Sequence, residues 1–391
     1  MTSVQDFAGV AVAVPVTVPY SRFSDRAAPW WIGSALRELL KQSGLRKEEI
    51  DGLAATSFTM GNDTTVALTE HFDMSPRWIE WLPTGGASGV MALRRAARAI
   101  QSGDANVVAC IAGDTANPES FSKLVANFSR FSDEAARPYG APGPNGVFAL
   151  ITANYMQRFG ATRADFGAIA VAQRANAQGN ANALLGSKPL DLDGYLAAPP
   201  IAEPLHLFDC VMPCAGAEAF LVMSQEKAAS LGLPHAIIKG AIERHNAFFS
   251  DPVATRGGWL QDRDQLYAQA GLGPNEVDCV QVYDDYPVIV AMQLEDLGFC
   301  DKGEAPQLLR SRSLRVDGDL PVNTCGGQLS CGQAGAAGGF LPVVEALRQI
   351  TGQTLGHRVA DAHIALASGY GMVVHDRCLA TGAVILEGAG R

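Results

Sequence analysis

Two glycine-rich turns, each running directly into an apolar helix, constrain the fold of this chain more than any other feature. The first turn is residues 85–89 (Gly-Gly-Ala-Ser-Gly), which lead into a helical pattern over residues 89–102. The second is the longer stretch 323–339, which leads into an apolar run over residues 340–351. Glycine lets backbone N–H groups approach a ligand closely, and a helix N-terminus adds partial positive charge. The pair predicts two similar half-domains, each with its own binding turn.

Strand-like and helix-like runs alternate on both sides of residue 232. This alternation predicts parallel strands with helices on both faces, and therefore an α/β fold. We predict one half at residues 1–232 and the other at residues 233–391. The predicted strands are 7–18, 50–57, 106–112, 217–224, 235–246, 279–283, 362–367 and 382–387. The predicted helices are 30–45, 89–102, 226–232, 262–270, 288–297 and 340–351.

The segment from about residue 117 to residue 213 breaks this alternation. Prolines surround two helical stretches, at residues 145–159 and 163–177. The segment is too long for an ordinary connection between elements, which predicts an inserted loop domain within the first half.

Charge and composition exclude several classes of function. The formal net charge of −10 argues against a nucleic-acid partner. No apolar run reaches the roughly 18–20 residues of a membrane span, and the N-terminus lacks the basic start of a signal peptide. Cys210 and Cys214 follow His206, but the spacing fits no common zinc pattern, so we expect no metal. Eight scattered cysteines predict a reducing, cytoplasmic setting.

The predicted strand at residues 106–112 is apolar along most of its length. An uncovered apolar edge strand tends to pair with another chain. We therefore predict a homodimer that forms edge to edge through this strand.

Four motifs in order along the chain resemble the thiolase superfamily, and within it the lipid-transfer-protein (SCP2-type) branch. They cover almost the whole chain. They are Gly-Gly-Ala-Ser-Gly-Val-Met-Ala-Leu at 85–93, Pro-Leu-His-Leu-Phe-Asp-Cys-Val-Met-Pro-Cys-Ala-Gly-Ala at 204–217, the stretch from Val-Gln-Val-Tyr-Asp-Asp-Tyr at 280–286 to Glu-Asp-Leu-Gly-Phe at 295–299, and the glycine loop at 323–339. The resemblance implies a five-layered αβαβα thiolase fold of two pseudo-symmetric halves.

The departures from that family concern its chemistry. The position of the family's nucleophilic cysteine is Gly86, and the position of its catalytic histidine is Gln333. The fourth-motif Asn or His is Tyr283, and no cysteine precedes the C-terminal run that contains Gly369 and Tyr370. Covalent acyl transfer needs a thiolate, so these positions argue against ordinary thiolase activity.

The pattern is similar to the cysteine-less steroid side-chain aldolases. That resemblance implies retro-aldol cleavage of a β-hydroxyacyl-CoA, with tyrosines for proton transfer and acyl-CoA as substrate but no further cofactor. It also implies a homodimer and a small OB-fold partner of the DUF35 type, which together form a heterotetramer.

The predicted catalytic residues are Tyr283, Tyr370 and Gln333, with the backbones of Gly86 and Gly369 holding the enolate oxygen. We expect the two tyrosine hydroxyls to face one another across the pocket. Each residue also has a structural alternative: either tyrosine as packing, Gln333 as a histidine lost without replacement, and Gly86 as a turn residue. Asp284 and Asp285, next to Tyr283, are interpreted as surface turn residues or helix N-caps.

Two other functions stay open on the sequence alone. One is an acyltransferase with a relocated nucleophile, for which Cys331 is the candidate thiol. The other is a non-catalytic subunit of thiolase fold that binds acyl-CoA. The sequence names neither the acyl group (steroid, aromatic or aliphatic) nor the released fragment, propionyl-CoA or acetyl-CoA.

Overall fold

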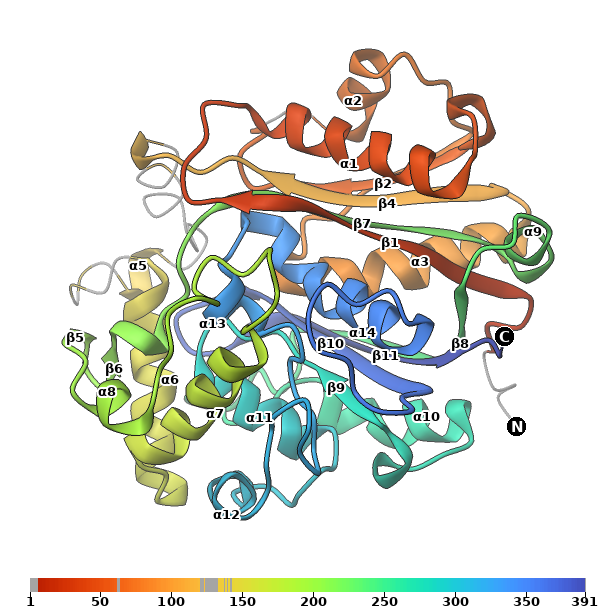
Figure 1. The fold of residues 1–391 in the computed structure, drawn as a ribbon. Helices are drawn as coiled ribbons and strands as arrows, with labels where there is room; N and C mark the ends of the chain where they lie inside the picture. Colours follow the sequence, from red (N-terminus) through yellow and green to blue (C-terminus); the bar gives the residue numbers. More distant parts are fainter. Residues whose placement is uncertain are drawn as a thin grey trace.

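The computed structural model describes residues 6–61, 64–119, 123, 133–136, 138, 140 and 143–390. A mixed sheet of nine strands crosses this part of the molecule in the order β3-β2-β4-β7-β1-β8-β11-β10-β9 (Figure 1). Its strands are β1 (Val10–Ser21), β2 (Gly52–Thr56), β3 (Trp78–Trp81), β4 (Val107–Asp114), β7 (Ala215–Ser224), β8 (His235–His245), β9 (Cys279–Gln281), β10 (Ile364–Val373) and β11 (Cys378–Gly388). A separate small sheet pairs β5 (Pro200–Ala202) with β6 (Leu205–His206).

The strand order is mirrored about the contact between β1 and β8. Outward from that contact, β7 pairs antiparallel with β1 in the first half, and β11 pairs antiparallel with β8 in the second. The next strand outward, β4 or β10, is antiparallel to β7 or β11. The next strand, β2 or β9, runs parallel to the last one, and the first half adds β3. This order confirms the predicted fold of two pseudo-symmetric halves. The expected boundary at residue 232 falls between α9 (Gln225–Ser230) and β8.

The prediction of purely parallel strands was wrong for β7 and β11. Only residues 374–377 separate β10 from β11, and so short a connection permits an antiparallel hairpin but no crossover. In the first half, residues 115–214 stand in the equivalent place between β4 and β7. The predicted loop domain is therefore inserted where the second half has a tight turn.

The helices form three layers around the two halves of the sheet (Figure 1). On one outer side, α1 contacts β1, β4 and β7, while on the other α10 contacts β8 and β11. Between them, α3 and α14 contact each other and strands of both halves, which makes the five predicted layers. The helices of these layers are α1 (Ala28–Ser43), α2 (Thr65–His71), α3 (Ser88–Ser102), α10 (Trp259–Ala270), α11 (Pro287–Asp296), α12 (Ala305–Ser311) and α14 (Leu341–Thr351).

The middle layer is buried on more than one face because it lies between the two halves of the nine-stranded sheet. Every residue from Leu341 to Ile350 of α14 is buried, and α3 buries Val90, Met91, Ala92 and Leu93 in succession. A helix buried all round is what a central layer requires.

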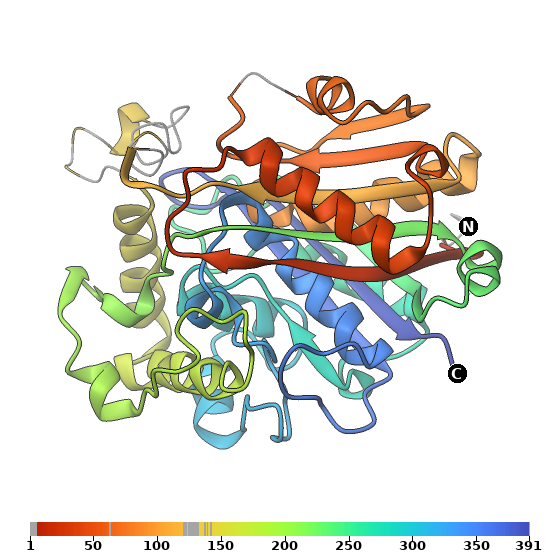
Figure 2. The same cartoon turned by 45° about the horizontal axis from the view of Figure 1, so that its top comes forward.

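The loop-domain helices lie at one end of the layers, away from both termini (Figure 2). They contact the second half, where α7 lies against α11 and α12. These helices are α5 (Asp133–Ala136), α6 (Pro144–Phe159), α7 (Arg163–Asn176) and α8 (Leu192–Leu196). Part of the predicted loop domain, residues 120–122, 124–132, 137, 139 and 141–142, lies outside the described residues.

The predicted edge strand at residues 106–112 is β4, and it is not an edge. It pairs with β2 on one side and with β7 on the other. The strand is apolar because helix layers cover both faces of the sheet. Among the described residues, the edges of this sheet are β3 and β9.

No helix in the described part of the chain is both long enough and apolar enough to cross a membrane.

Candidate active site

The first glycine turn is the 3-10 turn η2 (Gly85–Ala87), which feeds α3 and lies against β10. A β-carbon on Gly369 would lie 2.6 Å from the Cα of Ala87 and 2.7 Å from the carbonyl oxygen of Gly86. A β-carbon on Gly371 would lie 1.9 Å from a backbone oxygen just before the turn. The turn can lie on the strand only because both strand residues lack a side chain.

Tyr283 lies beyond the end of β9 and is buried. The Nε2 atom of Gln333 donates a hydrogen bond to its hydroxyl oxygen at 3.2 Å. Its ring covers Gly86, where an added β-carbon would lie 2.2 Å from Cε2 and 2.3 Å from Cζ. The structure thus brings together Gly86, Tyr283 and Gln333 from three separate motifs, with Gly369 behind the turn.

The Tyr283 ring occupies the volume that a side chain at residue 86 would fill. Residue 86 is the position where the resemblance implies a nucleophilic cysteine. A sulfur atom there and an aromatic ring at residue 283 exclude one another, because the carbon that would carry the sulfur already overlaps the ring. The glycine and the tyrosine therefore form a matched pair.

Replacing Gly86 with alanine is expected to lower the free energy of unfolding by about 1–3 kcal/mol, the usual cost of overpacking, because the new methyl group meets both the Tyr283 ring and the carbonyl oxygen of Tyr370. Chemical denaturation measures this change. Gly390→Ala is the matched control, since a β-carbon there meets nothing within 4 Å, and it should change stability by less than about 0.5 kcal/mol. Equal stability of both variants would contradict the crowding.

The backbone of Gln333 is fixed on both sides by the motif at 204–217. Its N–H donates to the carbonyl oxygen of Met212 at 2.8 Å, and its carbonyl oxygen accepts from the N–H of Cys214 at 2.9 Å. The second glycine loop is thereby held against the end of the loop domain, and the amide of Gln333 is aimed at Tyr283.

Asp284 holds the second glycine loop in place through hydrogen bonds to its backbone. It is buried, and its carboxylate accepts from the backbone N–H groups of Gln328 and Leu329 at 3.0 and 3.3 Å, at the start of α13 (Gly327–Cys331). Gln173 of the loop domain donates to it at 3.0 Å. Burial raises the pKa of Asp284 to about 7, although these hydrogen bonds act to lower it. Asp284 is therefore neither the predicted surface turn residue nor the N-cap residue of the helix that follows it, α11, whose N-cap is Tyr286; it accepts instead from the first turn of α13.

Asp285 is buried as well, and this carboxyl was missed as a candidate. Its Oδ1 atom has no hydrogen-bond partner among the described residues. Burial, followed by the charge of Asp284, raises the pKa of Asp285 well above its usual range. The charge of Asp285 in turn helps to raise the pKa of both Tyr283 and Tyr370.

The hydroxyl of Tyr283 keeps its proton at neutral pH. Burial raises the pKa of Tyr283 well above its usual range, and the charge of Asp285 adds to this. The hydrogen bond from Gln333 acts in the opposite direction but does not reverse the shift. In this setting the phenol is a hydrogen-bond donor rather than a base.

Tyr370 does not face Tyr283, which corrects the predicted arrangement. Successive side chains of a strand point to opposite faces, so Gly369 and Gly371 face η2 while the ring between them points away. That ring stacks on Trp259, with centroids 6.0 Å apart and planes at 23°, and lies 6.1 Å from the ring of Phe148. Its hydroxyl is buried, and burial, followed by the neighbouring Cys378 and the charge of Asp285, raises the pKa of Tyr370 well above its usual range.

The candidate thiol of Cys331 is buried in the middle of the molecule. It donates to the carbonyl oxygen of Cys325 at 3.2 Å, and the side-chain amide of Asn180 lies 3.7 Å from its sulfur. All eight cysteines are free thiols. Within the described residues, no group of three or more His, Cys, Asp or Glu side chains could hold a metal ion.

Two cavities, of about 470 and about 520 Å³, lie away from these residues, and neither is lined by Gly86, Tyr283 or Gln333. We identify the candidate site from the convergence of its side chains and backbone, because cavity size says nothing of chemistry.

The chain is similar to several known proteins. Residues 240–383 match the family model described as thiolase C-terminal domain-like. The chain is 30% identical to the 17-hydroxy-3-oxo-4-pregnene-20-carboxyl-CoA lyase of Mycobacterium tuberculosis, over 90% of this chain and 94% of that protein. It is 28% identical to the steroid side-chain-cleaving aldolase of Thermomonospora curvata, over 93% and 95% of the two chains. A solved structure of an Ltp2-ChsH2(DUF35) aldolase aligns with a TM-score of 0.83 at 27% identity, over 97% of this chain and 98% of that chain.

Proposed function

Because this chain belongs to the thiolase superfamily, in the branch that contains the steroid side-chain aldolases, we propose that it cleaves the Cα–Cβ bond of a β-hydroxyacyl-CoA. The reaction is a retro-aldol cleavage that yields a carbonyl compound and a shorter acyl-CoA. The observation that carries the proposal is the Tyr283 ring over Gly86, which replaces a thiol with a phenol at the reacting position.

The cleavage needs a base for the β-hydroxyl proton and donors for the enolate. As the base takes the proton, the oxygen lone pair forms the carbonyl, the Cα–Cβ bond breaks, and its electron pair moves to the thioester as an enolate. We assign the base to Asp285, because it follows Tyr283 closely in the chain, is buried with its Oδ1 atom unpartnered among the described residues, and has a raised pKa that favours proton uptake. The proton then returns from Asp285 to the α-carbon, which completes the cycle.

The donors in this proposal are the Tyr283 hydroxyl, the Gln333 amide and the backbone N–H of Gly86. Donors already in place where charge develops are worth more in a buried site than in water. Gly369 takes a packing role, since its missing side chain is what admits the turn. Tyr370 takes no part in proton transfer, because its ring lies on the other face of the sheet.

The substrate class we propose is a steroid-bearing β-hydroxyacyl-CoA, following the two relatives named above. The test incubates the purified chain with steroid, aromatic and aliphatic β-hydroxyacyl-CoAs and follows the carbonyl product and the released acyl-CoA. Release of a ketone and a short acyl-CoA from the steroid substrate is the expected result. Binding without turnover on every substrate would instead support the non-catalytic acyl-CoA-binding subunit.

The acyltransferase alternative needs a thiolate, and Cys331 is poorly suited to supply one because it is buried and donates to Cys325. Cys331→Ala and Cys325→Ala are each expected to keep kcat/KM for cleavage within about threefold, and iodoacetamide should leave the folded enzyme active. The assay is the release of carbonyl product. Loss of activity in either well-folded variant would restore the acyltransferase.

We propose a homodimer that binds a small DUF35/OB-fold protein to form a heterotetramer, as the resemblance to the steroid side-chain aldolases implies. The similar solved structure, an Ltp2-ChsH2(DUF35) aldolase, supports a partner of the DUF35 type. Light scattering of the chain alone and co-expressed with an OB-fold protein encoded nearby distinguishes monomer, dimer and heterotetramer. A cytoplasmic location is proposed from the eight free thiols.

A further inference from the structure

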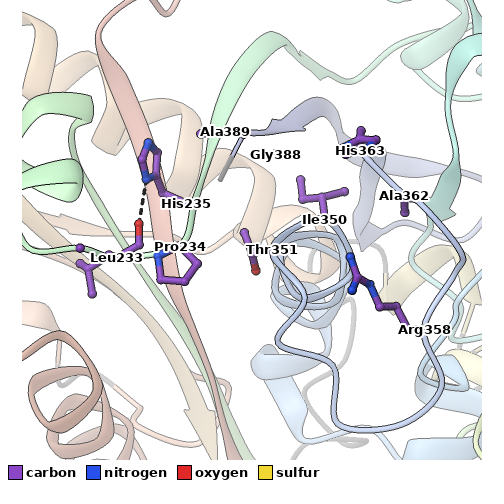
Figure 3. Close-up of a pocket in the computed structure, with 12 residues that line it drawn as sticks. Leu233, Pro234, His235, Ile350, Thr351, Arg358, Ala362, His363, Gly388 and Ala389 are labelled. Carbon is purple, nitrogen blue, oxygen red and sulfur yellow. Dashed lines mark hydrogen bonds between the residues drawn. The ribbon is translucent and has the colours of Figure 1, made fainter.

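A cavity of about 470 Å³ lies at the end of the sheet opposite the candidate active site. Its walls come from the loop before β8, the C-terminal end of α14, the loop before β10 and the residues that end β11 (Figure 3). Its lining residues are Gly232, Leu233, Pro234, His235, Ile350, Thr351, Arg358, Ala362, His363, Gly388, Ala389 and Gly390. The volume falls in the range of small-molecule sites.

The cavity is remote from the proposed chemistry. Ile364, which starts β10 next to the cavity, is five residues from Gly369 along the strand. At ~3.3 Å per residue this is about 17 Å, so a compact molecule bound in the cavity does not reach the candidate active site. The cavity therefore has no assigned role in the cleavage reaction.

The charge of the lining is one-sided. Arg358, His235 and His363 line the cavity, and none of its twelve lining residues is acidic. The whole chain carries a formal net charge of −10 with histidines counted as neutral, so a cavity whose one formally charged side chain is an arginine runs against the composition of the protein. A basic cavity of this kind favours a negatively charged ligand.

The basic side chains are free to bind. The guanidinium of Arg358 makes no hydrogen bond or ion pair with another described residue. In Figure 3 it reaches from its loop towards Ile350 and Thr351. The Nδ1 atom of His235 donates a hydrogen bond to the carbonyl oxygen of Leu233 at 2.8 Å, so its Nε2 atom can donate to an anion only when the ring carries both protons.

The remaining walls are apolar. Leu233, Pro234, Ile350 and Ala362 supply hydrocarbon surface beside the basic groups. A ligand that uses both kinds of wall has a compact apolar body and an anionic head. We propose that this cavity is a second binding site, for an organic anion that carries a carboxylate or a phosphate.

The experiment measures the dissociation constants of four probes for the full chain by ligand-observed NMR. The probes are phenyl phosphate, benzoate, the neutral benzyl alcohol and inorganic phosphate. At least one of the two aromatic anions is expected to bind at least about tenfold more tightly than benzyl alcohol and than inorganic phosphate, because only an aromatic anion uses both walls. Whichever of phenyl phosphate and benzoate binds more tightly shows whether the site prefers a phosphate or a carboxylate.

Three variants place the binding in this cavity. Arg358→Gln should raise the dissociation constant of the anion at least about tenfold and leave that of benzyl alcohol unchanged, because the substitution removes a charge-assisted hydrogen bond. Arg358→Lys should lose less affinity for the anion than Arg358→Gln, since a positive charge remains on the side chain. Arg37→Gln on α1, an exposed arginine in the opposite outer layer, is the matched control and should bind as the unaltered chain does.

Three results would overturn the proposal: equal binding of the anions by Arg358→Gln and the unaltered chain, equal binding of benzyl alcohol and the anions, or no binding by any aromatic probe. Thermal unfolding of each variant checks the fold, and Arg358→Lys tests the site if Arg358→Gln unfolds. The readout is binding alone, so the result is independent of whether the chain proves to be an aldolase.

Discussion

Replacing Tyr283 with phenylalanine is expected to lower kcat for retro-aldol cleavage about 100-fold or more while leaving the fold unchanged. The variant keeps the ring that fills the space over Gly86 and removes only the hydroxyl that Gln333 contacts. Loss of one donor to a developing oxyanion typically costs about 10²–10³ in rate. Single-turnover measurement of carbonyl release gives the effect without a contribution from product release.

Tyr370→Phe is the matched control for that change. Both residues are buried tyrosines in the second half, but the Tyr370 hydroxyl lies on the opposite face of the sheet, with Trp259 and Phe148. Its loss is expected to alter kcat by less than about threefold, since it takes no part in the proposed acid–base steps. A large loss in Tyr370→Phe together with full activity in Tyr283→Phe would reverse the assignment.

Replacing Asp285 with asparagine is expected to lower kcat/KM by about 10²–10⁴, the usual contribution of a general base. The amide has the same shape but cannot take up the β-hydroxyl proton. Asp284→Asn is the comparison, because Asp284 holds the second glycine loop through the N–H groups of Gln328 and Leu329. That variant should lose stability as well as activity, whereas Asp285→Asn should unfold at the same denaturant concentration as the unaltered chain or a higher one.

The same assignment fixes the direction of the pH dependence. The base form of Asp285 is the carboxylate, and burial raises the pKa of this group. Activity should therefore be present above that raised pKa and fall as the pH drops through it, at a higher pH than the ~4 of an ordinary aspartate. A profile of kcat/KM against pH shows this limb in the unaltered enzyme. An unchanged limb in the residual activity of Asp285→Asn would remove Asp285 as the base.

Much of the fold and part of the site followed from the sequence because both depend on local pattern. The glycine turns at 85–89 and 323–339 mark the two helix starts whose helices fill the middle layer. Gly86, Tyr283 and Gln333 lie in motifs that occur in family order, and the structure brings these three together. Their roles in catalysis stay predictions.

The placement of Tyr370 was wrong because it depends on which face of β10 lies against the first glycine turn. Successive side chains of a strand point to opposite faces. Gly369 was assigned a role through its backbone, which does not specify that face. In the structure the Gly369 face lies against η2, so Tyr370 points to the other side of the sheet.

The local sequence pattern could not predict which polar side chains are buried or which strands pair with one another. In the sequence, Asp285 resembles an ordinary turn residue beside Asp284. Only the surrounding elements of the structure show that its Oδ1 atom is buried without a hydrogen-bond partner among the described residues. In the same way, β4 resembled an exposed edge because apolar residues alone do not say which strands lie on either side. The direction of β7 depended on a connection of about a hundred residues, in which local signals carry no information about strand polarity.

The matched pair of Gly86 and Tyr283 also restricts how such a protein could change its chemistry in evolution. A cysteine acquired first at residue 86 would collide with the tyrosine ring. A smaller residue acquired first at residue 283 would leave a chain with neither the hydroxyl nor a thiol. Every order of single mutations between the two catalysts therefore passes through a protein that is either destabilised at this point or much less active, which favours inheritance of the two positions together.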